Sequence, residues 1–280
     1  MADRTAASTV VDYYDRHPIN EQQILNKLTA DGVALDGLSE DVLQNYDQDH
    51  FGGIGAVDVL AEKAGIAAGH YVLDVCSGVG GPARYLAHNH GCHVTGLELT
   101  ESRFEAAGRL TSMVGLAHLV DFRLGNALDM PFDDAAFDVV IGQEAWLHVP
   151  DKPRLIGECA RVVKPGGVIA FTDIVQNQPL EPAALARVQH AVAAADFGSL
   201  DGYAHLLREA GCVVREQEDL TEPWAEILVG RLEMYRSLKE QTIESFGVER
   251  FREWDEGYSF FVANVVAGRM GGVRIVAQRP

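Results

Sequence analysis

Short runs rich in Val, Ile and Leu alternate with helix-like stretches through the middle of the chain. Runs of this length predict strands, and the longer stretches between them predict helices. The predicted strands cover 71–75, 93–98, 120–124, 137–142 and 167–173, and the predicted helices lie near 82–89, 101–114 and 151–163. This alternation indicates an α/β fold, with a doubly wound, mostly parallel sheet that helices cover on both faces.

The pattern changes after residue 179. Helices are predicted there over 181–196, 199–210 and 222–245, and strands over 213–218 and 272–278. Together with the five earlier strands, these two complete a seven-stranded sheet. The long helical stretch between them predicts that one edge strand runs in the reverse direction.

Three further helices are predicted before the first strand, over 19–30, 39–43 and 54–64, with a loop at 47–53. Residues 1–17 are polar, and we expect them to be held loosely. We interpret residues 1–64 as a helical lid over the strand ends and 65–280 as the core. Within the core, about 179–212 and 222–268 are interpreted as insertions that cap the site.

Composition narrows the function classes. The 280 residues carry a formal net charge of −18, and 47% of them are hydrophobic, enough for a sizeable core. Such acidity argues against binding to a nucleic acid backbone or an anionic membrane. The chain shows neither an apolar leader nor an apolar run near the ~20 residues of a membrane span. Four scattered cysteines fit a reducing cytoplasm. The sequence leaves open whether the protein forms a homodimer.

A glycine-rich turn follows the first predicted strand. Asp74 lies in that strand, Gly78 and Gly80 can take positive φ angles, and Pro82 suits the first turn of a helix. The free N–H groups of that helix would face a ligand over the loop. The spacing also fits the dinucleotide fingerprint. An acid four residues before Gly78, however, favours a cationic or amine-bearing ligand.

The ends of the other strands carry polar side chains, at the edge where open α/β sheets bind ligands. Glu98 ends the second strand 20 residues after Gly78, where an acid accepts hydrogen bonds from both ribose hydroxyls. Asn126 follows the third strand, and its side-chain amide can pair with an adenine edge. The stretch 143–148 follows the fourth strand and would face the reacting end of the cofactor.

Residues 71–175 resemble a class I S-adenosylmethionine (SAM) methyltransferase. The resemblance is carried by the glycine loop, Glu98, Asn126-Ala127, Gln143-Glu144-Ala145 and Lys164-Pro165-Gly166-Gly167, which match in order and spacing. Within that superfamily the chain is similar to sarcosine/dimethylglycine N-methyltransferases, through 143–152, 158–162 and 197–200. The resemblance implies SAM as cofactor, and S-adenosylhomocysteine (SAH) as its product. The residues it assigns to the cofactor are Asp74, Ser77, Gly78, Gly80, Glu98, Leu99, Arg103, Asn126, Ala127, Leu128 and Gln143.

The acceptor is expected to be a small molecule, with an amine favoured. A neutral amine needs orientation rather than a strong base, and an acidic or aromatic lining tolerates the growing cation. Glu144, Trp146 and Tyr14 are expected in that lining. A hydroxyl or carbon acceptor needs a general base, for which the candidates are His50, Glu144 and His148. The alternatives are therefore O- or C-methylation of a natural product and, more remotely, a non-catalytic SAM-binding module.

Two other stretches are interpreted as structural. His88–His93 resembles a metal cluster, but it lies at the amino end of the second strand, away from the expected site. No metal is therefore predicted. Apolar residues within 224–254 are interpreted as the buried face of a cover helix; they are Ile227, Leu228, Leu232, Met234, Tyr235 and Leu238.

Overall fold

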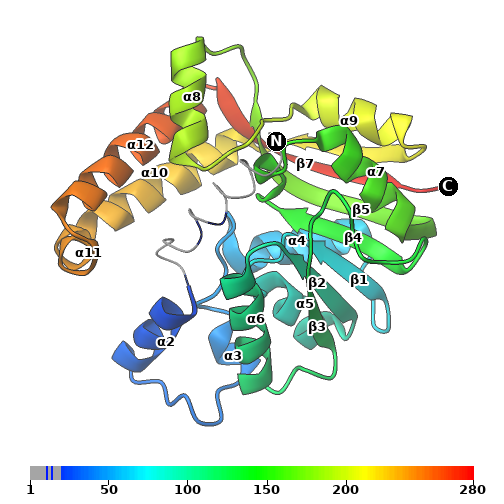
Figure 1. The fold of residues 1–280 in the computed structure, drawn as a ribbon, viewed down its shortest axis with the longest axis horizontal. Coiled ribbons are helices and arrows are strands. Elements are labelled where there is room, and N and C mark those ends of the chain that lie inside the picture. The colour runs from blue at the N-terminus through cyan, green and yellow to red at the C-terminus, as the bar shows by residue number, and fades with distance from the viewer. Residues whose placement is uncertain (1–10, 12–13, 15–19) are drawn as a thin grey trace.

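The computed structural model describes Val11, Tyr14 and residues 20–280, and most of the stretch 1–17 lies outside them. A single seven-stranded sheet runs through it in the order β3-β2-β1-β4-β5-β7-β6 (Figure 1). Its strands are β1 (Tyr71–Val75), β2 (His93–Glu98), β3 (Val120–Leu124), β4 (Phe137–Gln143), β5 (Val163–Gln176), β6 (Val213–Asp219) and β7 (Met270–Gln278). The first five are parallel, which confirms the predicted α/β fold.

The reversed strand is not at the edge, so this part of the prediction was wrong. β7 runs antiparallel to both β5 and β6 and lies between them. Burial explains the order: Val273, Ile275 and Val276 of β7 are all at most 3% exposed. The sequence of β6 is mostly charged and its side chains are largely exposed, which suits an edge that must not pair with another chain.

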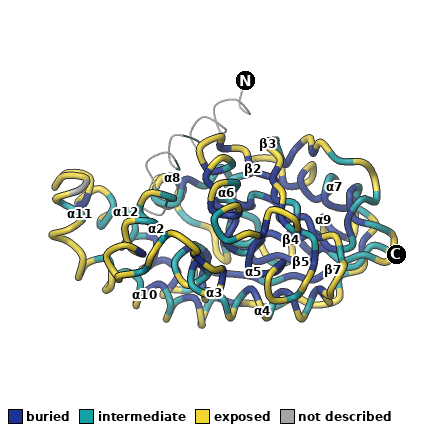
Figure 2. The backbone as a smooth tube through the Cα atoms, turned by 90° about the horizontal axis from the view of Figure 1, so that it is seen from below, coloured by how far each residue is buried: buried dark blue, intermediate teal, exposed yellow. Residues whose placement is uncertain are grey.

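Helices cover both faces of the sheet. α4 (Gly53–Ala64), α5 (Gly81–His90) and α6 (Glu101–Met113) pack on the face that carries Val72 and Val139. α7 (Lys152–Val162) and α9 (Leu200–Glu209) pack on the opposite face. Alternate strand residues point to opposite faces, so both layers are apolar. Figure 2 shows the buried backbone concentrated in the strands, with exposed backbone on the outer helices.

The last insertion forms an arm beside the sheet (Figure 1). It contains α10 (Thr221–Ser237), α11 (Lys239–Phe246) and α12 (Val248–Val266), where a single helix over 222–245 was predicted. Leu238 separates the first two helices, and Gly247 at φ 85° separates the last two. α8 (Pro182–Ala191) packs against α12 and is shorter than predicted, since Ala193 has a φ of 50°.

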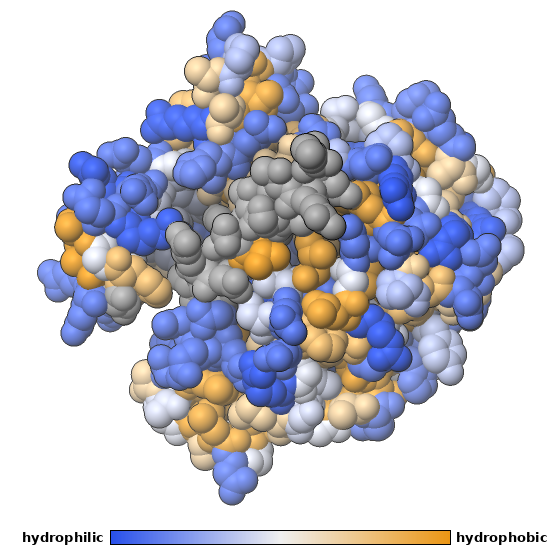
Figure 3. Space-filling model, in the orientation of Figure 1, coloured by the Kyte–Doolittle hydropathy of each residue, from blue (hydrophilic) through white to orange (hydrophobic). Residues whose placement is uncertain are grey.

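The amino-terminal helices lie against α6. Leu28 of α2 (Glu21–Ala30) and Leu43 of α3 (Glu40–Leu43) are fully buried in a cluster with Leu110. The division of the chain at residue 64 stays a prediction. In the described part of the chain, no helix is long and apolar enough to cross a bilayer. The face seen in Figure 3 is mostly hydrophilic, in keeping with the acidic composition.

Candidate active site

One cavity lies at the carboxyl ends of β1, β2 and β4, roofed by α10 and α12. Every residue predicted for the cofactor or for general base catalysis lines it, with the exception of Gly80. Gly80 instead caps α5 at φ 79°, and a Cβ there would lie 2.5 Å from the ring of Phe122. Glycine is needed at that position for backbone conformation and packing.

Glu98 is held rigidly beside the glycine loop. Its Oε2 accepts a hydrogen bond from the N–H of Gly78 at 2.9 Å, and its Oε1 accepts one from the N–H of Thr100 at 2.8 Å. The side chain is buried, at 6% exposure. Each carboxylate oxygen has a second lone pair, so Glu98 can accept further hydrogen bonds from a ligand.

Several buried polar atoms around the cavity have no hydrogen-bond partner among the residues that the structure describes. They are Oδ2 of Asp74, Oγ of Ser77 and both amide atoms of Gln143. Burial, and the nearby carboxylate of Glu98, raise the pKa of Asp74 to about 7. Unpaired buried polar groups are costly, so this set is suited to a ligand with both donors and acceptors. SAM has a carboxylate, an ammonium, a ribose and an adenine, and it fits this chemistry.

Backbone strain marks two of the strand ends. Cys76, just after β1, has a φ of 67°, and Glu144, just after β4, has a φ of 45°. Non-glycine residues in this region are uncommon and cluster at functional sites. Both residues line the cavity.

Glu144 connects the sheet to the loop between α3 and α4. Its Oε1 accepts a hydrogen bond from the hydroxyl of Thr172 at 2.6 Å, and its Oε2 accepts one from the N–H of Phe51 at 2.5 Å. Burial raises its pKa to about 7, although both hydrogen bonds oppose the rise. The geometry supports a role in holding the loop.

His50 lies in the same loop and is 6% exposed. Its Nε2 is 2.9 Å from the carbonyl oxygen of Gly53, which can only accept, so Nε2 carries the proton. Burial lowers the pKa of His50, and the ring is therefore neutral at pH 7. Nδ1 is then its basic nitrogen.

His148 lies in the short helix η1 (Trp146–His148) and is fixed at both ring nitrogens. Nδ1 is 2.9 Å from the carbonyl oxygen of Ala193, and Nε2 is 2.8 Å from the hydroxyl of Tyr14. Tyr14 in turn lies under the guanidinium of Arg103, 4.1 Å from the ring centroid. The structure thus brings Tyr14 and His148 together at the cavity, next to a cofactor-binding candidate.

The end of the cavity farther from the glycine loop is largely apolar. Tyr235 of α10 stands nearly perpendicular to Trp254 of α12, at 4.8 Å between ring centroids, and Trp254 stacks on Tyr258 at 5.2 Å. Other lining residues in this part are Phe51, Leu147, Ile174, Ala191, Val192 and Phe261. We refer to this part as the acceptor chamber.

Three expectations about other residues did not hold. Trp146 does not line the cavity: it is fully buried and stacks on Phe171 at 4.1 Å. A Cβ at Gly142 would lie 2.2 Å from its indole nitrogen, so that glycine gives the ring its space. Met234 and Leu238 are 45% and 37% exposed, so they do not belong to the buried face of a cover helix.

The histidines of 88–93 make separate contacts. His88 pairs with Asp41 at 2.9 Å, and His93 stacks on Tyr71 at 5.1 Å. Among the described residues, no three His, Cys, Asp or Glu side chains lie together as a metal site would need. The expectation that no metal is required stays a prediction.

Comparison with known proteins defines the family. A sequence family described as a methyltransferase domain matches residues 73–171. Methyltransferase GfsG of Streptomyces halstedii is 33% identical over 225 residues, which are 76% of this chain and 76% of that protein. This chain belongs to the SAM-dependent methyltransferases.

Two further comparisons are with N-methyltransferases whose names give different acceptors. The glycine/sarcosine/dimethylglycine N-methyltransferase of Actinopolyspora halophila is 34% identical over 70% of this chain, but the match spans only 34% of that longer protein. The structure of phosphoethanolamine N-methyltransferase 2 of Haemonchus contortus, determined with SAM, has a TM-score of 0.77. At 20% identity, over 96% of this chain and 59% of the other, it shows a shared fold.

Some lining residues carried no clear signal in the sequence. Asp49 and Phe51 lie in a loop that was predicted only as a connection, and Arg231 lies on a helix predicted only as a cover. One weak signal exists: Arg231 and Tyr235 are four residues apart, so a helix presents both on the same face.

Proposed function

We propose that this methyltransferase transfers a methyl group from SAM to a hydroxyl group of a small, largely apolar molecule. The observation that carries this proposal is the hydrogen bond between Tyr14 and His148 at the edge of the acceptor chamber. An oriented histidine beside an apolar chamber suits an acceptor that must lose a proton as it reacts.

The cofactor half of the cavity would hold SAM through the polar groups described above. Glu98 would accept hydrogen bonds from the ribose, and Asp74 and Gln143 would bind the amino acid part. Asn126 is oriented by the N–H of Leu128, which donates to its Oδ1 at 2.9 Å, and would contact the adenine. When bound, SAM supplies a methyl group that is already activated by the adjacent sulfonium.

His148 supplies the proton acceptor. The carbonyl of Ala193 can only accept, so Nδ1 of His148 carries the proton and Nε2 is basic. Nε2 would remove the hydroxyl proton of the acceptor as the acceptor oxygen takes the methyl group that bound SAM supplies, with SAH as the other product. Tyr14 holds the imidazole in place before the acceptor arrives, and the surrounding apolar residues exclude water.

The chamber favours an acceptor with an apolar body. Of the described residues that line the cavity, only Arg103 and Arg231 are cationic. Arg103 lies over the ring of Tyr14, and Arg231 donates to backbone carbonyls. A small carboxylate such as that of an amino acid therefore finds few partners among apolar and aromatic walls.

An amine acceptor is the second candidate, favoured by the aromatic group Tyr235, Trp254 and Tyr258. Aromatic faces attract ammonium groups, and the methylated product of an amine is a cation. A neutral amine needs no base, so His148 would then act only by orienting the acceptor.

The test is methyl transfer from radiolabelled SAM to a panel of paired compounds, each hydroxylated apolar molecule being matched with its amino analogue. Transfer to the hydroxyl members, lost in His148→Ala, supports the proposal. Transfer to the amino members alone, with His148→Ala costing only modest factors, would transfer support to the second candidate.

A further inference from the structure

The loop Asp47–Gly53 forms a wall shared by both halves of the cavity. Asp47 lies on the cofactor side: its carbonyl oxygen would be 2.4 Å from a Cβ at Gly81 of the glycine loop. Phe51 lies on the acceptor side, where its ring stands perpendicular to that of Trp224 at 5.0 Å. One short segment therefore contacts elements that are more than a hundred residues apart in the sequence.

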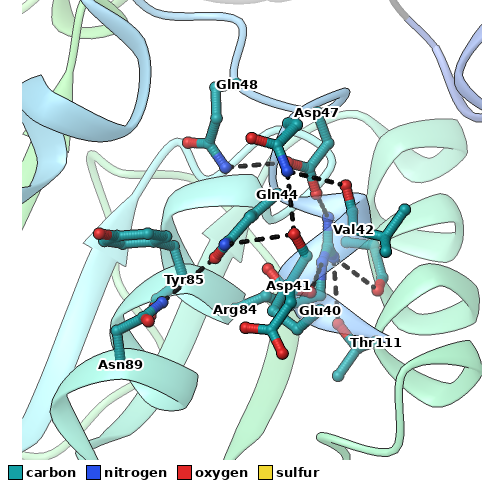
Figure 4. A network of polar contacts seen from close by, with 12 residues as sticks. Glu40, Asp41, Val42, Gln44, Asp47, Gln48, Arg84, Tyr85, Asn89 and Thr111 are labelled. Atoms are coloured by element: carbon teal, nitrogen blue, oxygen red, sulfur yellow. Dashed lines mark hydrogen bonds and ion pairs between the residues drawn. The ribbon is translucent and has the colours of Figure 1, made fainter. Parts of the chain in front are cut away.

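A buried ion pair fixes the loop on the cofactor side. Arg84 of α5 is fully buried, and its Nη2 donates to Oδ2 of Asp47 at 2.7 Å. Figure 4 shows Arg84 at the centre of this network, with Nη1 also donating to the hydroxyl of Thr111 at 3.1 Å. The glycine loop leads directly into α5, and Arg84 of α5 binds Asp47. This helix therefore joins the glycine loop to the start of the shared wall.

Arg231 of α10 fixes the loop on the acceptor side. Its Nη1 donates to the carbonyl oxygen of Asp49 at 3.1 Å, and its Nη2 donates to that of His50 at 2.7 Å. The guanidinium also lies 4.9 Å from the centroid of the Phe51 ring. The planar fork of arginine suits two neighbouring carbonyls, which a lysine cannot match.

We propose that Arg231 is a positioning residue that couples the two halves of the cavity through this loop. It holds the backbone of Asp49 and His50, and the same loop is held to the cofactor side by Asp47. A ligand that orders the loop from one side lowers the cost of ordering it for a ligand on the other side. The inference rests on the proposed function in that the two halves bind SAM and an acceptor.

The experiment combines titration with SAH and hydrogen exchange followed by mass spectrometry on the intact protein. The variants are Arg231→Met and Arg231→Lys, and the matched control is Arg236→Met, which removes an arginine of α10 that pairs with Asp255 at 2.6 Å. Circular dichroism establishes that each is folded. If Arg231→Met does not fold, Arg231→Lys carries the test.

In the wild type, SAH is expected to slow amide exchange both in 48–53 and in the part of α10 around Arg231. In Arg231→Met we expect faster exchange in 48–53, loss of the protection in α10, and SAH affinity weaker by about 5- to 100-fold. For both amide exchange and SAH affinity, Arg231→Lys is expected to lie between the wild type and Arg231→Met. Arg236→Met is expected to match the wild type.

Two outcomes would overturn the coupling. One is SAH affinity in Arg231→Met within about twofold of the wild type, well below the usual range for coupled sites. The other is a loss of affinity with unchanged exchange in 48–53, which would mean that Arg231 contacts the ligand directly. A wild type that does not bind SAH would instead refute the cofactor assignment.

Discussion

The hydroxyl of Tyr14 lies 2.8 Å from Nε2 of His148, although the two residues are 134 positions apart in the chain. The other ring nitrogen of His148 faces a carbonyl, so Nε2 is the acceptor in this pair. An acceptor hydroxyl that entered the chamber could replace the tyrosine hydroxyl at the same nitrogen. The pair thus shows how the site would present a base to its substrate.

Replacing His148 tests this directly. We expect His148→Ala to lower kcat by about 10²–10⁴, the usual contribution of a general base, with little change in SAH affinity. Tyr14→Phe should cost only about five- to tenfold, since it removes one orienting hydrogen bond. His88→Ala is the control, because His88 pairs with Asp41 on the surface. Equal activity in His148→Ala and His88→Ala would exclude His148 as the base.

Asp74 predicts a pH dependence of cofactor binding. Burial and Glu98 raise its pKa to about 7 in the ligand-free protein, so near neutral pH it is partly protonated. The ammonium of SAH favours the ionised carboxylate, and affinity should therefore rise as pH increases through 7. Calorimetry from pH 6 to 8 should show this rise in the wild type and in Asp36→Asn, an exposed control, but not in Asp74→Asn. If the SAH affinity of Asp74→Asn still rises with pH, another group is responsible and the prediction for Asp74 is wrong.

The part of the cavity that we propose for the cofactor has a lining that could be predicted from the sequence, because its residues follow strands in a fixed order. Asp74, Glu98 and Gln143 each lie at or near the carboxyl end of a parallel strand, and parallel strands bring those ends to one edge. The position of the reversed strand could not be predicted in the same way. It depends on which of β6 and β7 is buried between two neighbours. The charged sequence of β6 indicates that β6 is the edge strand.

The acceptor half was harder to predict because its contacts are set by backbone groups and by tertiary packing. Arg231 binds two carbonyls in a loop some 180 positions earlier, and no side-chain pattern reports such a contact. Trp146 was misplaced for a related reason. Its position after a strand end predicts a place in the site, but the space over Gly142 draws the indole into the core.

Glu40 predicts that stability depends on pH. It is 2% exposed, its carboxylate lies 3.7 Å from Arg84, and burial raises its pKa from 4.5 to about 8. Between these values the folded state holds a proton that the unfolded state has lost, so this group lowers the free energy of unfolding as pH rises from about 4.5 to 8. Glu40→Gln has no proton to lose in this range.

Chemical denaturation at pH 5 and pH 8.5 measures this effect. From pH 5 to pH 8.5, the free energy of unfolding of Glu40→Gln should rise relative to that of the wild type by at least about 1.4 kcal/mol, the equivalent of one pKa unit. Glu62→Gln, an exposed glutamate on α4, should show no such gain. If the free energies of unfolding of Glu40→Gln and the wild type differ by the same amount at both pH values, Glu40 is ionised in the folded state.

Two glycines in helices predict opposite responses to alanine. At Gly157 of α7 a Cβ would meet no atom of the described residues within 4 Å, so Gly157→Ala should stabilise the protein by about 0.5–1 kcal/mol through helix propensity. At Gly81 of α5 the Cβ would lie 2.4 Å from the carbonyl oxygen of Asp47, and this contact joins the glycine loop to the shared wall of the cavity. Backbone cannot move aside as a flexible side chain can. Gly81→Ala should therefore displace the loop, lower the free energy of unfolding by about 1–3 kcal/mol and weaken SAH binding. Thermal unfolding and SAH titration of the two variants measure these effects. A Gly81→Ala protein that is as stable as Gly157→Ala and binds SAH normally would show that the loop does not pack on the glycine turn.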